Sequence, residues 1–584
     1  MRTMTQSSSA APEPRLRWRL GLIAAAIVVV VTSIPQVGLI LERGSAWQGS
    51  YALIDFDELS YSAYLNALVQ GAPRRNNPYL GRESDQRNTG ESYFSIQFLP
   101  AYALAWPARA LGVSTSTTLI VVARLMAFAS ALAVFWLLFQ ITKNEKLAAV
   151  GTLIVLLCGR FTSESPLISV QHYSSFAFLR LYIPAVPFPL FFLFCGFAWR
   201  AFVGKSTKWA LAAGAIMAVL IYSYFYLWTA AAAWFFCFAV LWLIARAEDR
   251  RAAIKYILIV ASVSVAALVP YLYLLSQRAH TIDADQALTF SRMPDLFRVA
   301  EIVSIVIVLL LLLHVYRRRI QWRSPEVLFV GACAVTPFVV FNQQVITGIS
   351  LQAFHYEQFI INYVVIVGIV GTYHLIFWHW KIRPIVWAAF AVSVGLVTAV
   401  KDARDHSGLN VRGDRARLIS QRIESSNTHG LVLFDNSLLA ARALTDSRAP
   451  QLWSPNMHIY GGIDDTERLE RYYLYLYLLG VTPETFAHEL QNNAHTRVAV
   501  FGLQRVNTLL TQKFVPVSDA EIRAQIESYT SYVNNFSLPQ ASRWPLVYVV
   551  TIADHDFTNL DRWYTRSPVQ KNEECVVYEV RLRN

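Results

Sequence analysis

The sequence predicts a polytopic α-helical membrane protein with about eleven transmembrane helices, a long first extracytoplasmic loop and a C-terminal soluble α/β domain. Two observations predict this class. Hydrophobic residues make up 55% of the 584 residues and charged residues only 15%, which is too apolar for one soluble core. The apolar residues also recur as long uncharged runs without strand-like alternation, and such a run must be helical in lipid because its backbone N–H and C=O groups need internal partners.

The predicted spans follow one another along the chain. They are the apolar runs at 20–41, 118–141, 147–158, 183–203, 209–222, 224–245, 254–275, 302–316, 327–341, 360–380 and 384–400. The first run is long and lacks a small-x-small cleavage site, so we interpret it as a retained anchor rather than a cleaved signal peptide. Only Tyr222-Ser223-Tyr224 separates the fifth run from the sixth, and we interpret it as a tight outer turn. If these residues lay inside one long helix, every later span would be inverted.

Basic residues predict the orientation, because Lys and Arg are retained on the cytoplasmic side of short loops. Arg15, Arg17 and Arg19 precede the first span and alternate turns are again basic, whereas residues 342–359 contain no Lys or Arg. With an odd number of spans, we expect a cytoplasmic tail (1–19), a multi-pass domain (20–402) in the inner or plasma membrane, and extracytoplasmic placement of the first loop (42–117) and the C-terminal domain (403–584). The cytoplasmic turns account for most of the net charge of +12, so no nucleic-acid partner is predicted.

The C-terminal domain has the pattern of a compact α/β unit. Short β-branched or aromatic runs predict strands at 430–435, 497–501, 545–551 and 575–581, with helices at 464–479 and 483–490 between them. The domain carries no Gly-rich phosphate loop, zinc-ligand spacing or nucleophile elbow. Cys575 is its single cysteine, so we expect no disulfide and no metal cluster, and no cofactor is predicted to be required.

The first loop is far longer than a connection needs to be, and long ordered loops are disproportionately functional. Residues 55–71 and 91–112 suit interfacial helices, and Asp57 and Glu58 fall in the first turn of the former. Acidic residues stabilise a helix N-terminus, and capping is the alternative role for this pair. Their position just after a span, beside the lipid boundary, favours chemistry on a lipid-linked substrate.

At this point the chain resembles the GT-C class of membrane glycosyltransferases, including family 39-like and bacterial members. The resemblance rests on three segments: Asp57-Glu58 with Tyr61, Gly71 and NPYL at 77–80; the run at 91–112; and NQQVITG at 342–348 with Gln352, His355 and Tyr356. The chain departs from relatives that act on protein or lipid A, because it has the single Pro100 where they carry paired prolines. Its tail also shows no WWD-type motif of oligosaccharyltransferases.

The resemblance implies inverting transfer of a sugar from a polyprenyl-phosphate carrier to an acceptor hydroxyl on the extracytoplasmic face. The expected partners are a lipid-linked sugar donor, a lipid or glycan acceptor and the membrane. A sugar phosphate has a good leaving group, so one carboxylate that takes the acceptor proton suffices as general base. Asp57 is the first candidate for this catalytic role and Glu58 the second. A single in-line displacement inverts the anomeric centre, unlike the two-carboxylate retaining scheme.

Further candidates follow from the chemistry of this transfer. The departing lipid phosphate develops negative charge, which cations or hydrogen-bond donors must stabilise. The candidates for this role are Arg180, His172 and His355. The alternatives are a snorkelling interfacial Arg180 and a hydrogen-bonded surface His355. Contacts to the acceptor or sugar are expected from Asp55, Glu91, Tyr61, Gln343 and Gln352, with solvated or loop-capping roles as the alternatives. We predict no metal, since the pair Asp283 and Asp285 is weak evidence for a divalent cation.

Two other functional classes stay open. A transporter or flippase for lipid-linked glycans would carry ionisable residues at mid-span and paired broken helices, whereas the predicted spans are nearly free of charge. A non-catalytic cell-envelope assembly protein would keep the architecture but lose the base, and Asp57 argues against that loss.

Overall fold

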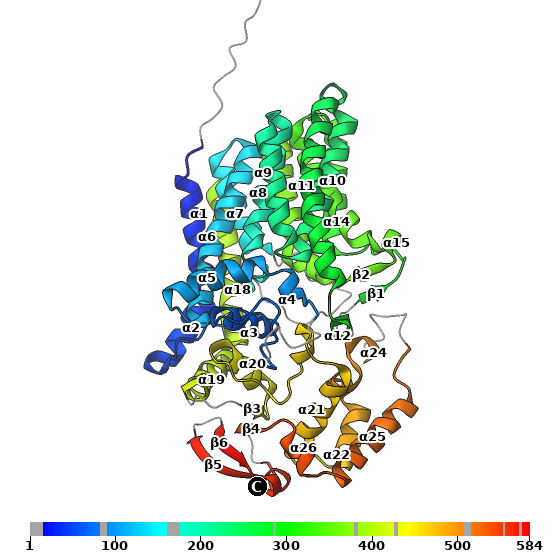
Figure 1. Ribbon diagram of the computed structural model, residues 1–584. Helices are drawn as coiled ribbons and strands as arrows, with labels where there is room; N and C mark the ends of the chain where they lie inside the picture. The colour runs from blue at the N-terminus through cyan, green and yellow to red at the C-terminus, as the bar shows by residue number, and fades with distance from the viewer. Residues whose placement is uncertain are drawn as a thin grey trace, which may run out of the picture.

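The computed structural model has a helical bundle at one end, the C-terminal tail at the other, and the helices of the first loop between them (Figure 1). It describes residues 16–81, 90–159, 176–283, 288–378, 383–425, 430–506, 515–552, 555–571 and 575–583. The first loop and the tail therefore meet at one end of the bundle, which places two polar regions far apart in sequence side by side.

Each predicted apolar run coincides with helix. The bundle helices are α1 (Arg19–Thr32), α2 (Ile34–Arg43), α6 (Thr115–Thr142), α7 (Glu145–Leu157), α8 (Pro187–Val203), α9 (Thr207–Ile221), α10 (Phe225–Ala245), α11 (Arg250–Ser276), α13 (Val299–Tyr316), α14 (Pro325–Asn342), α17 (Asn362–Thr372) and α18 (Pro384–Asp405). Two π-helical turns, Glu357–Ile361 and Tyr373–Phe377, flank α17.

Fewer helices than the eleven predicted spans are long and apolar enough to cross a membrane. In the described residues seven helices are long and apolar enough to cross a membrane, or up to eight if the bent pair α1 and α2 is one span. The third, fourth and fifth predicted spans are the shorter helices α7, α8 and α9, which have 13, 17 and 15 residues. The polytopic helical class is confirmed, and about eleven spans remains a prediction.

The separation of the fifth and sixth runs is real. Helix α9 ends at Ile221 and α10 begins at Phe225, and Tyr224 between them is extended, with φ −161° and ψ 122°. The Tyr222 hydroxyl donates to the Ala267 carbonyl (2.9 Å), which ties the turn to α11. The alternative of one continuous helix is wrong.

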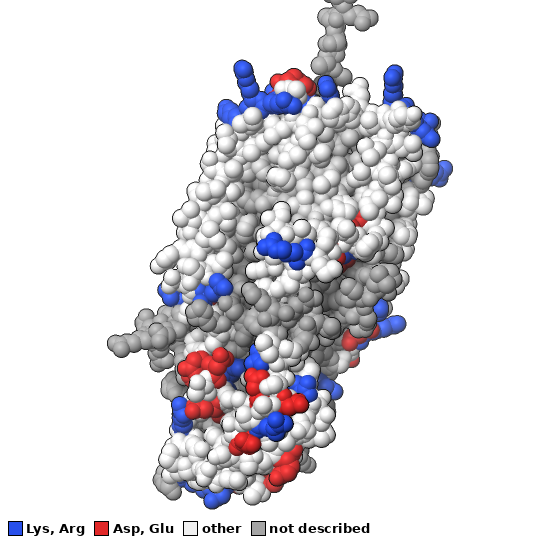
Figure 2. Space-filling model, turned by 90° about the vertical axis from the view of Figure 1, so that its right-hand side faces the viewer, with Lys and Arg blue, Asp and Glu red and all other residues white. Residues whose placement is uncertain are grey.

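Charge is distributed along the bundle as a membrane protein requires. Figure 2 shows Lys and Arg side chains gathered at the end farthest from the tail, then a broad band with few charges, and mixed charges over the tail. At the basic end, Asp249 pairs with Lys205 (2.7 Å) and Arg246 (2.7 Å). This arrangement agrees with a bundle whose basic turns share one side.

The first loop contains α3 (Glu58–Val69), α4 (Tyr93–Ile96) and α5 (Leu99–Leu111). The interfacial position expected for α3 is wrong, because ten of its twelve residues are buried and it packs against α5, α6 and the tail helix α20 (Ser437–Asp446). Helix α5 has the expected amphipathic character, since it buries Ala101 and Ala105 and exposes Trp106 and Leu111. The tail therefore covers the face of α3 that was expected to meet lipid.

The tail begins with α19 (Ser407–Ser425) and ends in a four-stranded sheet of order β3-β4-β6-β5. Strand β3 (Leu431–Phe434) is parallel to β4 (Leu546–Thr551), while β6 (Val576–Leu582) is antiparallel to both β4 and β5 (Tyr564–Lys571). The remaining tail helices are α21 (Asp465–Leu478), α22 (Pro483–Asn492), α23 (Ala494–Phe501), α24 (Leu503–Val506), α25 (Asp519–Asn534), α26 (Leu538–Ser542) and α27 (Thr558–Trp563).

Three of the predicted strands and both predicted helices of the tail are confirmed. The strand predicted at 497–501 is wrong, because these residues form the end of α23, whose N-terminus is capped by the Asn493 side chain. A short apolar run has no periodicity that separates a strand from a buried helix.

Short elements complete the structure. They are α12 (His280–Asp283), β1 (Leu288–Phe290), α15 (Gln344–Thr347), β2 (Ile349–Leu351), α16 (Ala353–Tyr356) and the 3-10 turns Gly44–Ala46, Ala177–Leu179, Ala247–Asp249 and Met457–Tyr460. Strand β1 pairs antiparallel with β2.

Candidate functional site

A cavity of about 430 Å³ lies where the bundle, the first loop and the tail meet. Its walls come from α3 and α4, the segment before α8, the start of α10, the turn between β2 and α16, and the tail. Five residues selected from the sequence line it together: Asp57, Tyr61, Arg180, Gln352 and His355. The fold thus collects side chains from three distant parts of the chain.

Arg180 is the central cation of this cavity and is only 2% exposed. One terminal nitrogen, Nη1, lies 3.1 Å from Asp57 Oδ2 and 3.5 Å from Asp55 Oδ2, and Nη2 donates to the Tyr224 hydroxyl at 3.3 Å. The guanidinium also lies over the Phe359 ring, 4.4 Å from its centroid. A buried cation held this way is a fixed charge, and it is not the snorkelling interfacial arginine that was the alternative.

The backbone before α8 places Arg180. A single 3-10 turn, Ala177–Leu179, precedes it, and Phe178 packs on Phe188 of α8 with ring centroids 4.9 Å apart. The following Leu181 has φ +40°, a conformation that L residues other than Asn and Asp rarely adopt. The Tyr182 hydroxyl then donates to the Tyr61 carbonyl (3.0 Å), which ties this segment to α3.

The acidic turn holds three carboxylates in three environments. The Asp57 side chain is 58% exposed and lines the cavity, whereas Asp55, which contacts the same nitrogen of Arg180, is 10% exposed and does not line it. The cavity walls raise the pKa of the Asp57 carboxyl by desolvation, and the Arg180 guanidinium opposes that rise. Asp57 N–H donates to Asp55 Oδ1 at 3.0 Å, so the two acids form one compact turn.

Glu58 lies apart from the cavity. It is 1% exposed, and its carboxylate accepts the Ile54 N–H at 3.0 Å. Burial, with the charge of Asp55 adding to it, raises the pKa of Glu58 to about 8. The second catalytic candidate is therefore a buried acid that holds its proton near neutral pH, and it faces a small cavity of about 50 Å³ beside α6.

The opposite wall is built by the β2–α16 turn and α10. The Tyr226 hydroxyl donates to Gln352 Oε1 at 3.0 Å, and Gln352 itself has φ +40°. The His355 ring stacks on Phe359 with centroids 5.2 Å apart and is 8% exposed, so it is not a surface histidine. A strained polar residue that lines a cavity is a common mark of a functional site.

Aromatic rings give the cavity flat apolar faces of the kind that stack on sugars. Tyr61 and Phe94 meet edge to face at 4.9 Å, and Phe94 stacks on Tyr460 of the tail at 4.5 Å. Sequence reasoning selected Tyr61 but missed Tyr224 and the tail residues Asn456 and His458, which also line the cavity. The aromatic cluster around the turn at 222–226 was the available signal for Tyr224.

Two expected sugar or acceptor contacts lie elsewhere. Glu91 is 1% exposed and forms ion pairs with Arg74 (2.6 Å) and Arg75 (3.3 Å), so its carboxylate is occupied inside the first loop. Gln343 lines a separate cavity of about 340 Å³ beside α10 and donates to the Ile349 carbonyl. Neither residue lines the Arg180 cavity.

His172 and Asp285 fall outside the described residues, as does the side chain of Asp283. Within the described part of the chain, no group of three or more His, Cys, Asp or Glu side chains is placed to hold a metal ion.

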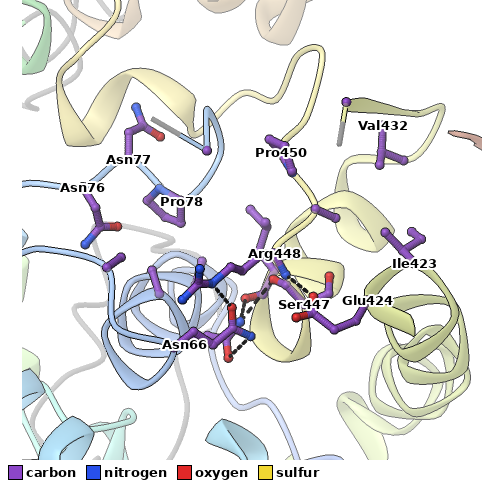
Figure 3. A pocket seen from close by; sticks show the side chains of 18 of the residues that line it. Asn66, Asn76, Asn77, Pro78, Ile423, Glu424, Val432, Ser447, Arg448 and Pro450 are labelled. Atoms are coloured by element: carbon purple, nitrogen blue, oxygen red, sulfur yellow. Dashed lines mark hydrogen bonds between the residues drawn. The ribbon is translucent and has the colours of Figure 1, made fainter. Parts of the chain in front are cut away.

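A second and larger cavity, of about 750 Å³, lies on another face of α3 (Figure 3). Helix α3 gives Ser60 and Tyr61 to the Arg180 cavity and Ala63 and Asn66 to this one. Figure 3 shows the loop residues Asn66, Asn76 and Asn77 facing Glu424 and Arg448 of the tail. The cavity follows the seam between the first loop and the tail.

Comparisons with known proteins give structural similarity only. No protein-family model matches the chain, and no curated protein matches it. ArnT from Cupriavidus metallidurans, in a crystal structure bound to undecaprenyl phosphate, is similar with a TM-score of 0.42 and 11% identity over 95% of this chain and 98% of that one.

The Archaeoglobus fulgidus oligosaccharyltransferase, in a crystal structure tethered to an acceptor peptide containing the NVT sequon, is similar with a TM-score of 0.44 and 10% identity. The match covers 96% of this chain and 74% of that one. Both TM-scores lie below 0.5, so the proposals below are based on the residues of this chain.

Proposed function

We propose that this protein transfers a sugar from a polyprenyl-phosphate carrier to an acceptor hydroxyl, with inversion, in the Arg180 cavity. The observation that carries the proposal is the juxtaposition of an accessible carboxylate, Asp57, with a buried, fixed cation, Arg180, in a cavity walled by aromatic rings. A base and a phosphate-binding cation are the two groups that such a transfer requires.

Asp57 is the proposed general base. The acceptor hydroxyl must lose a proton as its oxygen attacks the anomeric carbon, and a carboxylate whose pKa is raised above its ordinary value accepts a proton more readily. One displacement then forms the new C–O bond, breaks the bond to the phosphate oxygen and inverts the configuration.

Arg180 is the proposed partner of the departing phosphate. The charge that develops on the leaving oxygen is stabilised most by a cation already held in place, and the contacts to Asp55, Asp57 and Tyr224 hold this one. His355 and Gln352 lie on the opposite wall, where they would contact phosphate or sugar oxygens. Tyr61 supplies a ring face for the sugar.

The position of the cavity in the bundle also supports the proposed sugar transfer. The cavity lies at the start of α10, at the end of the bundle opposite the basic turn that follows α10 at Arg246. By the distribution of Lys and Arg, that end is extracytoplasmic, with the N-terminus in the cytoplasm and the tail outside in the periplasm or cell envelope. A lipid carrier in the outer leaflet would present its phosphate at this depth.

The test is sugar transfer by membranes that contain wild type or Asp57→Asn, assayed with radiolabelled polyprenyl-phosphate-linked hexose and pentose donors. We expect the variant to be about 10²–10⁴-fold slower, because it keeps the shape of the side chain but not its basicity. Asp295→Asn is the matched control, since Asp295 also pairs with an arginine but does not line the cavity.

Unchanged transfer by Asp57→Asn would remove Asp57 as the base. Labelled lipid that crosses the bilayer of proteoliposomes without being consumed, in both wild type and variant, would instead favour the flippase. Neither product nor lipid movement with any donor would favour the assembly protein.

A further inference from the structure

The segment that leads into the acidic turn, residues 48–53, is held by side chains of α2 and of the tail. Gln36 of α2 donates to the Ser50 carbonyl (3.1 Å) and accepts the Ala52 N–H (2.7 Å). Asp414 of α19 is fully buried and accepts the Gln48 N–H (3.0 Å), the Ser50 hydroxyl (2.8 Å) and the Arg43 Nε (2.9 Å). The nearby Arg442 of α20 donates to the Tyr51 carbonyl (3.3 Å). The path of the loop towards Asp55 is therefore set jointly by α2 and by residues more than 350 positions later in the chain.

Asn410 makes the contact nearest to the acids. Its Oδ1 accepts the Leu53 N–H at 2.6 Å and its Nδ2 donates to the Leu53 carbonyl at 3.1 Å, so one side chain satisfies both backbone groups of one residue. Asn410 is 3% exposed, and Arg442 Nη2 donates to the same Oδ1 at 3.3 Å. This two-point contact fixes the position and the rotation of the Leu53 peptide groups.

The fixed peptide continues directly into the proposed base. Ile54 N–H, next to Leu53, donates to the Glu58 carboxylate, which closes the turn that contains Asp55 and Asp57. Beyond the turn, the tail holds α3 as well: the Ser62 and Thr445 hydroxyls are 2.9 Å apart, and Asn66 donates to the carbonyls of Leu444 and Ser447 (Figure 3). The acidic turn is thus held from both sides by the tail.

We propose that Asn410 is a positioning residue for Asp57, and that the tail acts in sugar transfer by fixing the acidic turn against Arg180. The proposal rests on the proposed function. A displacement of about 1 Å at a reacting group can cost about 10²-fold in rate. The Asp57–Arg180 contact of 3.1 Å leaves little tolerance for such a shift.

The experiment compares Asn410→Ala and Asn410→Asp with wild type in full-length, detergent-solubilised protein. Asn77→Ala is the matched control for the uptake measurement: Asn77 is also 3% exposed and also joins the first loop to tail carbonyls, those of Met457 and Gly461, but it does not contact residues 48–58. Deuterium uptake of peptides spanning 48–58 is measured together with kcat and KM for the labelled donor.

In Asn410→Ala we expect faster deuterium uptake confined to 48–58 and a kcat lowered about 10–100-fold, with KM for the donor changed less than about threefold. Asn410→Asp keeps the acceptor for the Leu53 N–H and replaces the donor to its carbonyl by a charged oxygen beside Arg442, so it should fall between wild type and Asn410→Ala. Asn77→Ala should lose thermal stability to a similar extent without faster uptake at 48–58.

Unchanged uptake at 48–58 in Asn410→Ala would overturn the proposal, and so would a kcat of Asn410→Ala equal to that of wild type. The uptake measurement does not depend on catalysis. If Asp57→Asn retained full transfer while uptake at 48–58 still rose in Asn410→Ala, the proposed base would have failed and the contact between tail and turn would stand without its catalytic role.

Discussion

Replacement of Arg180 tests the site most directly, because this residue joins both walls of the cavity. Arg180→Gln removes a charge that contacts Asp57 at 3.1 Å, Asp55 at 3.5 Å and Tyr224 at 3.3 Å. If that charge meets the departing phosphate, its loss costs about 2.7–4 kcal/mol of transition-state stabilisation, which corresponds to about 10²–10³-fold in the rate of transfer. Arg180→Lys keeps the charge but not the planar fork, so we expect a smaller loss of about tenfold.

The pH dependence gives an independent readout. The Arg180 charge lowers the pKa of Asp57, so its removal should raise that pKa further. The base must be ionised to act, and the acidic limb of the rate profile of Arg180→Gln should therefore move to higher pH, while that of Arg180→Lys should stay near wild type.

The assay is single-turnover transfer from the labelled lipid-linked donor between pH 5 and 9. Arg298→Gln is the matched control, because Arg298 also pairs with two carboxylates, Asp295 and Glu357 at 2.8 Å each, and also lies over an aromatic ring, but it does not line the cavity. The reasoning is refuted if Arg180→Gln transfers sugar within about threefold of wild type with an unshifted profile, or if Arg298→Gln is equally impaired.

The remaining predictions concern residues that the structure separates by burial. Glu58 has a pKa of about 8 in the folded state against about 4.5 when unfolded. Its contribution to stability is therefore greatest below pH 4.5 and is lost as pH rises towards 8. The melting temperature of Glu58→Gln should lack this decrease with pH, and a decrease as steep as that of wild type would contradict the raised pKa. Gln352→Ala should raise KM for the donor about 10-fold because its side chain lines the cavity, whereas Gln343→Ala should change it less than twofold, and equal effects would contradict the placement. Glu91→Gln should lower the melting temperature by weakening its pair with Arg74, with KM unchanged, as differential scanning fluorimetry and donor titration would show.

The sequence allows the helices to be predicted well, because long uncharged runs in lipid have one structural solution. The turn at 222–224 was predictable for a local reason, since three polar or aromatic residues interrupt two apolar runs. The helix at 497–501 was not predictable, because a run of five residues is too short for its apolar pattern to separate a strand from a helix. The burial of α3 depends on α20, some 380 residues later, and a local hydrophobic pattern carries no information about such a partner.

The candidate site was also predictable only in part: its residues could be selected from the sequence, but their contacts could not. Asp57, Arg180 and His355 could be selected individually because each is a chemically suitable residue in an outer loop. That Arg180 contacts both Asp55 and Asp57 depends on the packing of the segment before α8 against α3. Glu91 was misplaced for the opposite reason: its partner Arg74 lies 17 residues away in the same loop, and ion pairs inside a loop leave no periodic trace in a sequence.

The acidic turn contains three carboxylates within four residues, and burial explains why one of them suits the role of base. Glu58 is 1% exposed and holds a proton near neutral pH, so it has little capacity to accept another. Asp55 is 10% exposed, accepts the Asp57 N–H through Oδ1, contacts Arg180 through Oδ2 and does not line the cavity. Asp57 alone of the three lines the cavity, with 58% of its side chain exposed. Because the tail holds the backbone on both sides of this turn, its contacts help to set which of the three carboxylates faces the cavity, and this is the role proposed for Asn410.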